Sequence, residues 1–493
     1  MQAYKLNIKD VAERLKGEGL IKKISPKAEE LFADFFCYDS RQITNNTLFI
    51  CKGAAFRKEY LCGAQQAGMV CYISEALYEG VKTEYIIVND IRRAFAVVSM
   101  MFFGYERNRP ELCAFVGTKG KTTSVYMLKS ILEKTGERFA YSTTVEMNDG
   151  VKTELSRLTT PESYDLHRLI SSAKQNGCKR MLMEVSSMAY KVKRVYGMRF
   201  RYGAFTNISP DHIGVKEHPT FEDYLACKTN ILKMCENVCI NLDDPLAGDI
   251  ISELGGYSRV MTYSVTNPDA DVFVTGTEKR EGGKIITVHT PEGEFDVFMH
   301  LPGDYNVLNA LCAVCCAYMM GIGTKAIQQG FENVKVPGRM DKISQNGYTV
   351  ISDYAHNKVS MSCALKALRD EYPDKNIIAV FGASYKVEKR REDLATEAAK
   401  FAKYVYITCD NPSFEDPYEI ALQIKGFLDK FGCPCEIETD RRLAVMKAVK
   451  EMSKDDIVLI TGKGRERYQI IKGENVFYEG DLECAKEALE LYK

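Results

Sequence analysis

The chain has 493 residues, of which 45% are hydrophobic and 27% charged, with a net charge of -1 at pH 7. This length is too great for one core and predicts about three domains, while the near-zero charge argues against a partner such as nucleic acid or an anionic membrane. Because no stretch reaches roughly 18 apolar residues and the first residues, MQAYKLNIKDVAERLKGEGL, lack an apolar signal core, we expect a cytoplasmic protein.

The 17 cysteines raise the question of disulfides or bound zinc. Cys312, Cys315 and Cys316 fall among Ala, Val and Met at helical intervals. This pattern predicts small core residues of a protein in a reducing compartment. Since no pair of C-x-x-C knuckles faces another, the spacing argues against structural zinc.

The first segment offers one polar motif. Asp39, Ser40 and Arg41 close a predicted strand in FFCYDSRQITNNTLFICKG and precede the turn-prone residues Thr-Asn-Asn. Taken alone, this motif indicates an ordinary surface turn.

A phosphate-binding loop is predicted after a joint near residues 105–111. Residues 114–116 end a buried strand, and apolar residues recur at helical spacing from Thr122 until Gly136 stops the pattern. The turn between them aims a helix N-terminus outward, where free N–H groups favour an anion. Gly117 and Gly120 would let the backbone approach that anion, and Lys121 would reach its terminal oxygens.

The sequence of this loop differs from that of the general P-loop. Phe115 stands where the general P-loop has its first glycine, so the loop is the shorter G-T-x-G-K-T-T form. In that form Thr122 or Thr123 can hold a magnesium ion. The alternative is a basic surface turn without a ligand.

A lysine stands in the apolar stripe of a later helix. Pro219, then Thr220 and Asp223 at capping-box spacing, mark the helix start, and Lys228 falls among its apolar residues. A buried ammonium must find a carboxylate, lose its proton or be chemically changed. A neutral amine can react with carbon dioxide to give a carbamate, an anion that could bind magnesium. The alternative is a lysine whose side chain snorkels to solvent.

Other polar residues lie close to this helix in the sequence. His212 and His218 precede it, and Glu184 follows the apolar run Met-Leu-Met at a predicted strand end. A carboxylate at that position could bind the metal ion of a nucleotide-binding site. Isolated histidines are usually structural, so this group gains weight only together with the phosphate loop.

The third segment begins where Pro337 and Gly338 interrupt a helix-rich stretch. Short apolar runs at 376–382, 404–410 and 456–462 then alternate with helical patterns. This alternation predicts parallel strands with crossover helices, whose carboxyl-end loops form the crevices where open α/β sheets bind ligands.

At this point the chain resembles the Mur ligase superfamily, most closely its MurE branch, the UDP-N-acetylmuramoyl-tripeptide synthetases of peptidoglycan assembly. The matching motifs occur in family order over nearly the whole chain: DSR (39–41), GTKGKTT (117–123), LTTPES (158–163), MEVSS (183–187), FTNISPDHI (205–213), LPGDYNVLNAL (301–311), VPGRMD (336–341), DYAH (353–356), DNPSFEDP (410–417) and GKGRE (462–466).

The resemblance implies an α/β chain of three domains: 1–108 for the uridine nucleotide, 109–336 as a central P-loop ATPase, and 337–493 as a Rossmann-like domain that binds the amino acid. It implies ATP and Mg²⁺, and a reaction in which the D-glutamate carboxylate of UDP-N-acetylmuramoyl-L-alanyl-D-glutamate attacks the γ-phosphate. The amine of a diamino acid then displaces phosphate from the acyl phosphate. Such chemistry needs a clamp that neutralises the moving charge.

Position by position, the resemblance implies these roles. Lys121, Glu184, His212 and Lys228 would be catalytic, and the metal ligands would be Thr122, Glu184, His212 and carbamylated Lys228. ATP would contact Gly117, Thr118, Lys119, Gly120, Lys121, Thr122, Thr123, Asn306, Asn309, Arg339, Asp353 and His356. The uridine-linked substrate would meet Ser40, Thr159, Thr160, Ser186 and Arg194, and the amino acid would meet Asp410, Asn411, Ser413, Gly462 and Glu466. For Asn306 and Asn309 a simple helix start remains the alternative.

Some residues depart from the family pattern. Lys119 replaces a usual Asn, Met188 a usual His, and Arg465 a common His. Ser413 stands where enzymes that add meso-diaminopimelate usually have an arginine that pairs with the second carboxylate. We therefore favour L-lysine as the amino acid. Which of Lys386, Lys389, Arg390 and Arg391 holds its carboxylate is left open.

Two alternatives remain. One is another amide ligase of the superfamily, related to folylpolyglutamate or cyanophycin synthetases, against which the DSR and LTTPES motifs stand. The other is a non-catalytic paralogue, suggested by Met188, Arg465 and the unusual 382–393 loop. For the protein we expect small-molecule substrates (the UDP-N-acetylmuramoyl dipeptide, a diamino acid and ATP), a monomer, and neither nucleic-acid nor membrane partners.

Overall fold

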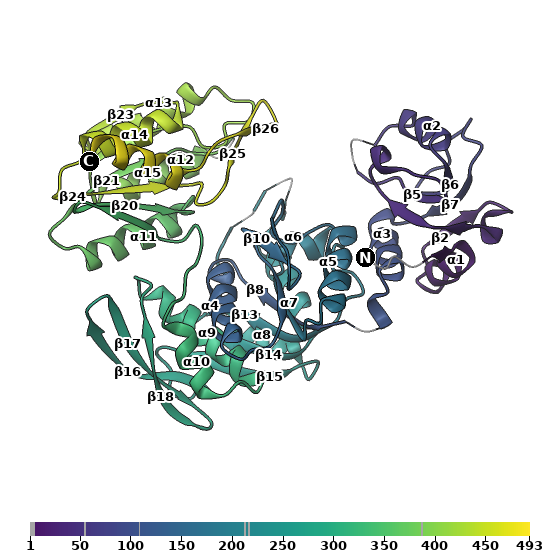
Figure 1. Cartoon of the computed structure of the whole chain (residues 1–493), viewed down its shortest axis with the longest axis horizontal. Helices are drawn as coiled ribbons and strands as arrows, with labels where there is room; N and C mark the ends of the chain where they lie inside the picture. Colours follow the sequence, from purple (N-terminus) through teal and green to yellow (C-terminus); the bar gives the residue numbers. More distant parts are fainter. Residues whose placement is uncertain (1–4, 54–55, 108, 212, 215–216, 386–387) are drawn as a thin grey trace. The chain divides into compact units, whose positions relative to one another are not determined.

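The computed structural model describes residues 5–53, 56–107, 109–211, 213–214, 217–385 and 388–493. Its contacts divide the chain into unit 1, Met1–Phe273 with Leu311–Ile327, and unit 2, Val274–Ala310 with Gln328–Lys493. The division into three domains at 108 and 336 stays a prediction. Within the residues described, no helix is both long and apolar enough to cross a membrane. The α/β fold class is confirmed by the alternation of helices and strands (Figure 1).

The first part of unit 1 is a five-stranded sheet in the order β2-β7-β6-β5-β4. Helices α1 and α3 bury their apolar side chains in one core with this sheet, and α2 contributes to a second. The strands are β2 (Ile21–Ile24), β4 (Phe35–Cys37), β5 (Thr47–Ile50), β6 (Met69–Ser74) and β7 (Glu84–Val88), with a small pair β1 (Leu6–Asn7) and β3 (Phe32–Ala33). The helices are α1 (Ile8–Gly17), α2 (Glu59–Gln66) and α3 (Ile91–Phe102).

The second part of unit 1 contributes strands to a larger sheet, in which their order is β11-β10-β9-β12-β8-β13-β14-β15, and β16 begins at the end of this part. Neighbours from β9 to β16 pair in parallel, so their carboxyl ends share one edge. The strands are β8 (Glu111–Val116), β9 (Phe139–Ser142), β10 (Glu146–Asn148), β11 (Thr153–Leu155), β12 (Arg180–Glu184), β13 (Phe200–Phe205), β14 (Cys235–Asn241), β15 (Arg259–Ser264) and β16 (Val272–Arg280).

Helices cover this central sheet and connect its strands. Apolar residues of α5, α7 and α8 share one core with β8, β12, β13 and β14. Helix α4 packs on β8 and β12 and begins at Lys121, one residue before the predicted start. The helices are α4 (Lys121–Glu133), α5 (Ser163–Gln175), α6 (Ser187–Lys191), α7 (Phe221–Leu232) and α8 (Ala247–Leu254).

Unit 2 contains the parallel sheet predicted for the third segment, in the order β19-β20-β24-β21-β22-β23. Helices α11, α12 and α13 pack on one face, and α14 and α15 on the other. Only β19 runs antiparallel among these described strands. The strands are β19 (Asp341–Gln345), β20 (Tyr348–Asp353), β21 (Asn376–Phe381), β22 (Ala402–Ile407), β23 (Cys435–Ile437) and β24 (Asp456–Thr461).

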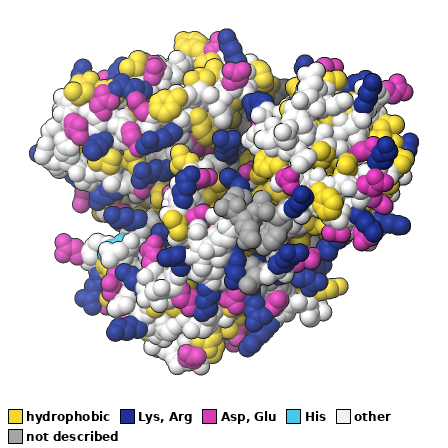
Figure 2. Space-filling view, turned by 45° about the vertical axis from the view of Figure 1, so that its right-hand side comes forward, with side chains coloured by type: hydrophobic (Ala, Val, Ile, Leu, Met, Phe, Trp, Pro, Cys, Tyr) yellow, Lys and Arg dark blue, Asp and Glu magenta, His cyan; other side chains and the backbone are white. Residues whose placement is uncertain are grey.

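The remaining elements complete the chain. The helices of the parallel sheet are α11 (Lys358–Glu371), α12 (Glu388–Ala399), α13 (Pro417–Lys430), α14 (Arg441–Glu451) and α15 (Asp481–Tyr492). A hairpin joins β25 (Tyr468–Ile471) to β26 (Glu474–Phe477). Before the sheet come β17 (Gly283–Thr290), β18 (Gly293–Met299), α9 (Tyr305–Met319) and α10 (Thr324–Phe331). The face drawn in Figure 2 intersperses cationic and anionic side chains, in keeping with the near-zero net charge.

Candidate active site

The predicted phosphate loop lies between β8 and α4. Gly120 caps α4 with a φ of 85°, a left-handed conformation that glycine adopts without strain. Gly117 approaches the end of β13 so closely that a Cβ added to it would lie 1.9 Å from the Thr206 hydroxyl oxygen. Both glycines are therefore required by the backbone path, which leads into the N-terminus of α4, the end of a helix that favours an anion.

Residues that follow β13 hold the loop in place. The Thr206 hydroxyl donates to the carbonyl of Lys119 at 2.6 Å, and the side-chain oxygen of Asn207 accepts from the Lys119 N–H at 2.9 Å. The Thr118 hydroxyl lies 3.1 Å from the hydroxyl of Tyr224 on α7. This role of Thr206 and Asn207 was not predicted from the FTNISPDHI motif, although an amide and a hydroxyl directly after a strand end were a usable signal.

Two lysines of the loop have different surroundings. The ammonium of Lys121 donates to the carbonyls of Gly117 at 2.8 Å and Thr118 at 3.1 Å, so it lies over the loop itself. Lys119 forms an ion pair with Asp211 at 3.1 Å. Asp211 therefore offsets the extra positive charge that the departure at Lys119 brings to the loop.

Glu184 lies at the carboxyl end of β12, next to the loop. Its Oε1 accepts from the hydroxyl of Thr122 at 2.8 Å and from the N–H of Thr144 at 2.9 Å. Its Oε2 accepts from the Thr144 hydroxyl at 3.1 Å, and the hydroxyl oxygens of Thr144 and Thr159 lie 3.2 Å apart. A carboxylate and a hydroxyl at a helix N-terminus are hard oxygen donors, so these residues fit Mg²⁺.

Lys228 is buried rather than snorkelling, because its side chain is only 2% exposed. Its Nζ donates to the carbonyl of Gly117 at 2.7 Å and lies 4.5 Å from the centre of the Tyr224 ring. Burial lowers the pKa of Lys228 well below its usual range, and the charge of Lys121 lowers it further. Among the described residues no carboxylate lies within ion-pair distance of its Nζ, so the neutral amine is favoured.

The two histidines near α7 differ in what the structure describes. His212 lies outside the described residues. His218 is fully buried, with Nδ1 2.6 Å from a carboxylate oxygen of Asp223 and Nε2 2.9 Å from the hydroxyl of Ser187. His218 thus links the start of α7 to α6, the helix that follows Glu184. The sulfur of Cys227 lies near the side chains of His218 and Asp223.

The residues predicted for the uridine-linked substrate are also in unit 1. The Thr160 hydroxyl donates to the carbonyl of Glu184 at 3.0 Å and accepts from the N–H of Ser186 at 3.0 Å. Arg194 donates to the carbonyl of Thr160 at 3.2 Å and to Glu162 at 3.0 Å. These contacts gather Thr160, Ser186 and Arg194 around the end of β12.

Two further features accompany this group. Ser40 begins a short 3-10 helix at Ser40–Gln42, after Asp39, whose carboxylate accepts from Arg41. Lys52, two residues after β5, forms an ion pair with Glu162, which also pairs with Arg194. Lys52 had no predicted role, since no sequence signal connects it to residue 162.

The ATP contacts predicted beyond the loop lie in unit 2. The carboxylate of Asp353 accepts from the N–H groups of Met340 at 2.9 Å and Ala355 at 2.7 Å, and burial raises its pKa. The guanidinium of Arg339 lies 4.8 Å from the centre of the Tyr354 ring. His356 Nδ1 lies 2.9 Å from the carbonyl of Tyr354. Asp353 therefore holds the backbone directly after Arg339 and the backbone between Tyr354 and His356.

The two asparagines of α9 contact each other. The side-chain N–H of Asn309 donates to the side-chain oxygen of Asn306 at 2.9 Å, and that of Asn306 donates to the carbonyl of Pro302 at 2.6 Å. Both side chains are buried. These bonds are typical of an ordered helix start, and the role of the pair in binding ATP stays a prediction.

The residues predicted for the amino acid gather at the carboxyl ends of β22 and β24. Asp410 and Asn411 follow β22, and Gly462 and Glu466 follow β24. Ser413 has a φ of 51°, and its backbone N–H donates a hydrogen bond to the carbonyl of Ile470 in β25 at 2.8 Å. Of the basic residues left open, Lys386 lies outside the described residues, while buried Arg391 already donates to Glu415 at 2.6 Å and to Gln423 at 2.7 Å.

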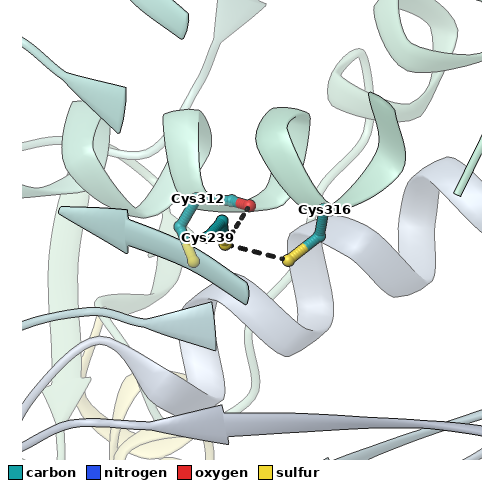
Figure 3. A group of neighbouring side chains, drawn as sticks. All are labelled: Cys239, Cys312 and Cys316. Atoms are coloured by element: carbon teal, nitrogen blue, oxygen red, sulfur yellow. Dashed lines mark hydrogen bonds between the residues drawn. The ribbon is translucent and has the colours of Figure 1, made fainter. Parts of the chain in front are cut away.

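The cysteines are free thiols, as predicted. Cys312 and Cys316 of α9 lie beside Cys239 of β14, with the sulfurs of Cys239 and Cys316 3.4 Å apart (Figure 3). Burial raises the pKa of Cys239 and of Cys312. Neutral, buried thiols behave as small apolar side chains, which agrees with the predicted core role.

Comparison with known proteins places this geometry in context. The Mur ligase middle domain matches residues 116–317, and the Mur ligase glutamate ligase domain matches residues 338–464. A UDP-N-acetylmuramyl-tripeptide synthetase of Lactobacillus acidophilus is 36% identical over 490 residues, which covers 92% of both chains. A UDP-N-acetylmuramoyl-L-alanyl-D-glutamate--L-lysine ligase of Streptococcus pneumoniae serotype 4 is 36% identical and covers 98% of this chain and 100% of the relative.

Solved structures share the fold. A UDP-N-acetylmuramoyl-L-alanyl-D-glutamate--2,6-diaminopimelate ligase superposes with a TM-score of 0.68 at 24% identity, and 99% of each chain is covered. At this identity the likeness shows the fold alone.

Proposed function

Because this chain belongs to the Mur ligase family, we propose that it is an ATP-dependent, ADP-forming amide ligase that joins L-lysine to UDP-N-acetylmuramoyl-L-alanyl-D-glutamate. One observation carries the proposal. The phosphate loop, the carboxylate of Glu184 and the buried amine of Lys228 converge, with Thr122 2.8 Å from Glu184 and Lys228 2.7 Å from the Gly117 carbonyl.

The loop would bind and neutralise the phosphates of ATP. Backbone N–H groups at the start of α4 and the ammonium of Lys121 are donors for phosphate oxygens. Such a clamp lowers the barrier to phosphoryl transfer onto the substrate carboxylate because it stabilises the charge of the moving group. Thr118, Lys119 and Thr123 belong to the same loop and its first helical turn, and we assign them to the same ligand.

Glu184 and Thr122 would hold Mg²⁺, which supplies a charge that neutralises phosphate oxygens. Lys228 would complement them after carbamylation. In that step the neutral amine bonds to carbon dioxide and releases one proton, which leaves an anionic carbamate. The lowered pKa of Lys228 favours the step because only the unprotonated amine reacts. His212 is kept as a proposed ligand, although it lies outside the described residues.

The other substrates would bind beside this centre and in unit 2. Ser40, Thr159, Thr160, Ser186 and Arg194 are assigned to the uridine-linked substrate. We assign Asn306, Asn309, Arg339, Asp353 and His356 to ATP, and Asp410, Asn411, Ser413, Gly462 and Glu466 to the amino acid.

The preference for L-lysine rests on Ser413 and on the relatives. A serine cannot form the bidentate ion pair with a second substrate carboxylate that an arginine forms. The relative in Streptococcus pneumoniae is named for L-lysine. We further propose that the protein works in the cytoplasm as a monomer on small molecules, without nucleic-acid or membrane partners, in keeping with a net charge of -1.

A phosphate-release assay tests the proposal. Purified protein with ATP, Mg²⁺ and UDP-N-acetylmuramoyl-L-alanyl-D-glutamate is supplied in turn with L-lysine, meso-diaminopimelate and L-ornithine. We expect L-lysine to give the highest kcat/KM. No turnover with any of the three would reject the ligase function and leave the non-catalytic alternative.

The same assay tests the role of Lys228. Lys228→Ala removes the proposed metal ligand, so we expect kcat to fall by roughly 100-fold or more. Acetate or formate should restore part of the rate by supplying an anionic oxygen. An alanine variant with full activity would show that carbamylation is not needed.

A further inference from the structure

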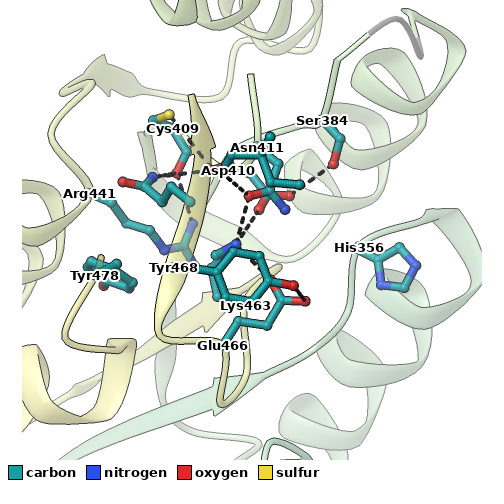
Figure 4. Close-up of polar contacts among 12 residues, drawn as sticks. His356, Ser384, Cys409, Asp410, Asn411, Arg441, Lys463, Glu466, Tyr468 and Tyr478 are labelled. Atoms are coloured by element: carbon teal, nitrogen blue, oxygen red, sulfur yellow. Dashed lines mark hydrogen bonds and ion pairs between the residues drawn. The ribbon is translucent and has the colours of Figure 1, made fainter. Parts of the chain in front are cut away.

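The GKGRE motif contains a lysine that the proposed function does not use. Lys463, directly after Gly462, is fully buried in unit 2. Its Nζ donates to the side-chain oxygen of Asn411 at 2.9 Å and to Oε2 of Glu466 at 2.7 Å, and it lies 3.6 Å from Oδ1 of Asp410 (Figure 4). One ammonium therefore contacts three of the residues assigned to the incoming amino acid.

Asp410, Asn411 and Glu466 share the ammonium of Lys463 as a partner, while their other contacts differ. Asp410 Oδ2 accepts from the Ser384 hydroxyl at 3.3 Å, while its Oδ1 is buried and accepts no hydrogen bond from the described part of the chain. The Tyr354 hydroxyl donates to Oε1 of Glu466 at 3.0 Å. In Figure 4 the ammonium of Lys463 lies between Asp410, Asn411 and Glu466.

The charges of these side chains do not balance. The neighbouring cation, Arg441, donates to both carboxylate oxygens of Asp481, at 2.7 and 2.8 Å, and so is already paired. Within the described part of the chain, Lys463 is the cation that lies within ion-pair distance of both Asp410 and Glu466. This group therefore has one negative charge in excess, which suits a ligand that carries an ammonium.

The orientation of Asn411 depends on the same lysine. Its side-chain oxygen accepts from Lys463 and also from the N–H of Ile470 at 2.9 Å. With its oxygen held twice, the amide turns its N–H₂ group to the opposite side. A donor there can meet the carboxylate of an amino acid whose ammonium faces the carboxylates.

We propose that Lys463 is a positioning residue for the amino acid substrate, which holds Asn411 and Glu466 in the arrangement that binds both the ammonium and the carboxylate of L-lysine. This inference rests on the proposed function. Because Lys463 is fully buried, water cannot replace its ammonium, and its loss leaves the buried carboxylate of Asp410 and the partly buried carboxylate of Glu466 without their shared partner.

The test separates the two halves of the reaction. Formation of the acyl phosphate needs only ATP and the uridine-linked substrate, and hydroxylamine captures that species as a hydroxamate with release of phosphate. Addition of L-lysine needs the amino acid site. For Lys463→Met we expect kcat/KM for L-lysine to fall on the order of 100-fold, with hydroxamate formation and the KM for ATP as in the wild type.

Two further variants complete the design. Lys403→Met removes an exposed lysine of β22 that pairs with Asp456 at 3.1 Å, and it should leave both half-reactions unchanged. Lys463→Arg keeps the positive charge but moves its donors, so we expect a smaller fall of about 10-fold in kcat/KM for L-lysine. If Lys463→Met fails to fold, judged by its melting temperature, the arginine variant decides.

Several results would overturn the inference: wild-type kcat/KM for L-lysine in Lys463→Met, an equal fall of both half-reactions, or wild-type kinetics in Lys463→Arg when the methionine variant is unfolded. Failure of the proposed function looks different, because the wild-type protein would then form no hydroxamate at all.

Discussion

Lys228 and His167 are buried side chains of unit 1 that can carry a positive charge. Lys228 has a proposed use, as the amine that becomes a magnesium ligand. His167 of α5 has none: it lies in an apolar setting, with its ring 5.0 Å from that of Tyr105 and, among the described residues, no hydrogen-bond partner for either nitrogen. Burial lowers the pKa of His167 to about 3 from its ordinary 6.5.

His167 should make unit 1 sensitive to acid. Between pH 6.5 and pH 3 the unfolded chain binds a proton at His167 that the folded chain excludes, so stability is lost as the pH falls. The loss is about 1.4 kcal/mol for each pH unit below the unfolded pKa. From pH 7 to pH 5 we expect the wild type to lose about 2 kcal/mol more than His167→Leu, measured by chemical denaturation.

A control separates this effect from the general response to acid. His300 is exposed, so His300→Leu should show the same difference between pH 7 and pH 5 as the wild type. If His167→Leu loses as much stability on acidification as the wild type, the buried neutral histidine is not the cause.

At the scale of single elements, α7 organises one side of the candidate site. Thr220 caps the helix by accepting from the N–H of Asp223 at 3.2 Å, as the predicted capping-box spacing requires. Asp223 then holds His218, whose other nitrogen contacts Ser187 at the start of α6. One helix therefore carries Lys228 while its first turn is tied to the helix that follows Glu184.

Breaking this tie should affect both folding and activity. His218→Ala leaves Ser187 and Asp223 without their shared partner, so we expect the free energy of unfolding to fall by about 2–3 kcal/mol. We also expect kcat to fall by roughly 10-fold because Glu184 and Lys228 are no longer held in register. Denaturation and the phosphate-release assay measure the two effects.

A double-mutant cycle with Ser187→Ala tests whether the contact itself is responsible. If it is, the coupling energy between the two positions should reach about 1 kcal/mol in unfolding. Strictly additive losses would show that His218 acts through packing alone.

At the scale of the whole molecule, each unit has its own hydrophobic cores. In unit 1 two cores lie on the faces of the first sheet, and another is formed by α5, α7 and α8 with β8, β12, β13 and β14. In unit 2 they lie on the two faces of the parallel sheet. One of the two cores in unit 2 includes α14 and α15. The fully buried ion pair of Arg441 and Asp481 joins these two helices.

Removing that ion pair should destabilise unit 2 selectively. Arg441→Met leaves the carboxylate of Asp481 buried and uncompensated, at a cost of about 3–5 kcal/mol. Native-state hydrogen exchange should therefore show reduced protection in β20, β21 and β24, with little change in β8 and β12 of unit 1. Equal loss of protection in both units would contradict this independence.

Arg442→Met is the matched control. Arg442 is the next residue, is partly exposed, and pairs with Glu479 and Glu487 at the surface. Since exposed ion pairs contribute about 0–1 kcal/mol, we expect hydrogen exchange in this variant to resemble that of the wild type.

The sequence by itself determined the parts of the site that depend on local pattern. Glycine spacing, a strand end and a helix start are properties of consecutive residues, so the loop at 117–123, the cap at Thr220 and the parallel strands of unit 2 were all predicted. The family motifs added the expected ligase chemistry.

Only the tertiary structure decided what depends on distant segments. Burial of Lys228, rather than exposure, follows from the packing of α7 against a loop more than a hundred residues earlier in the chain. The contacts of Asn207 with Lys119, of Lys52 with Glu162 and of Lys463 with Asn411 likewise join segments that no local pattern relates. Whether an ionisable side chain is solvated, paired or neutral is set by its surroundings in space, and those surroundings exist only once the chain has folded.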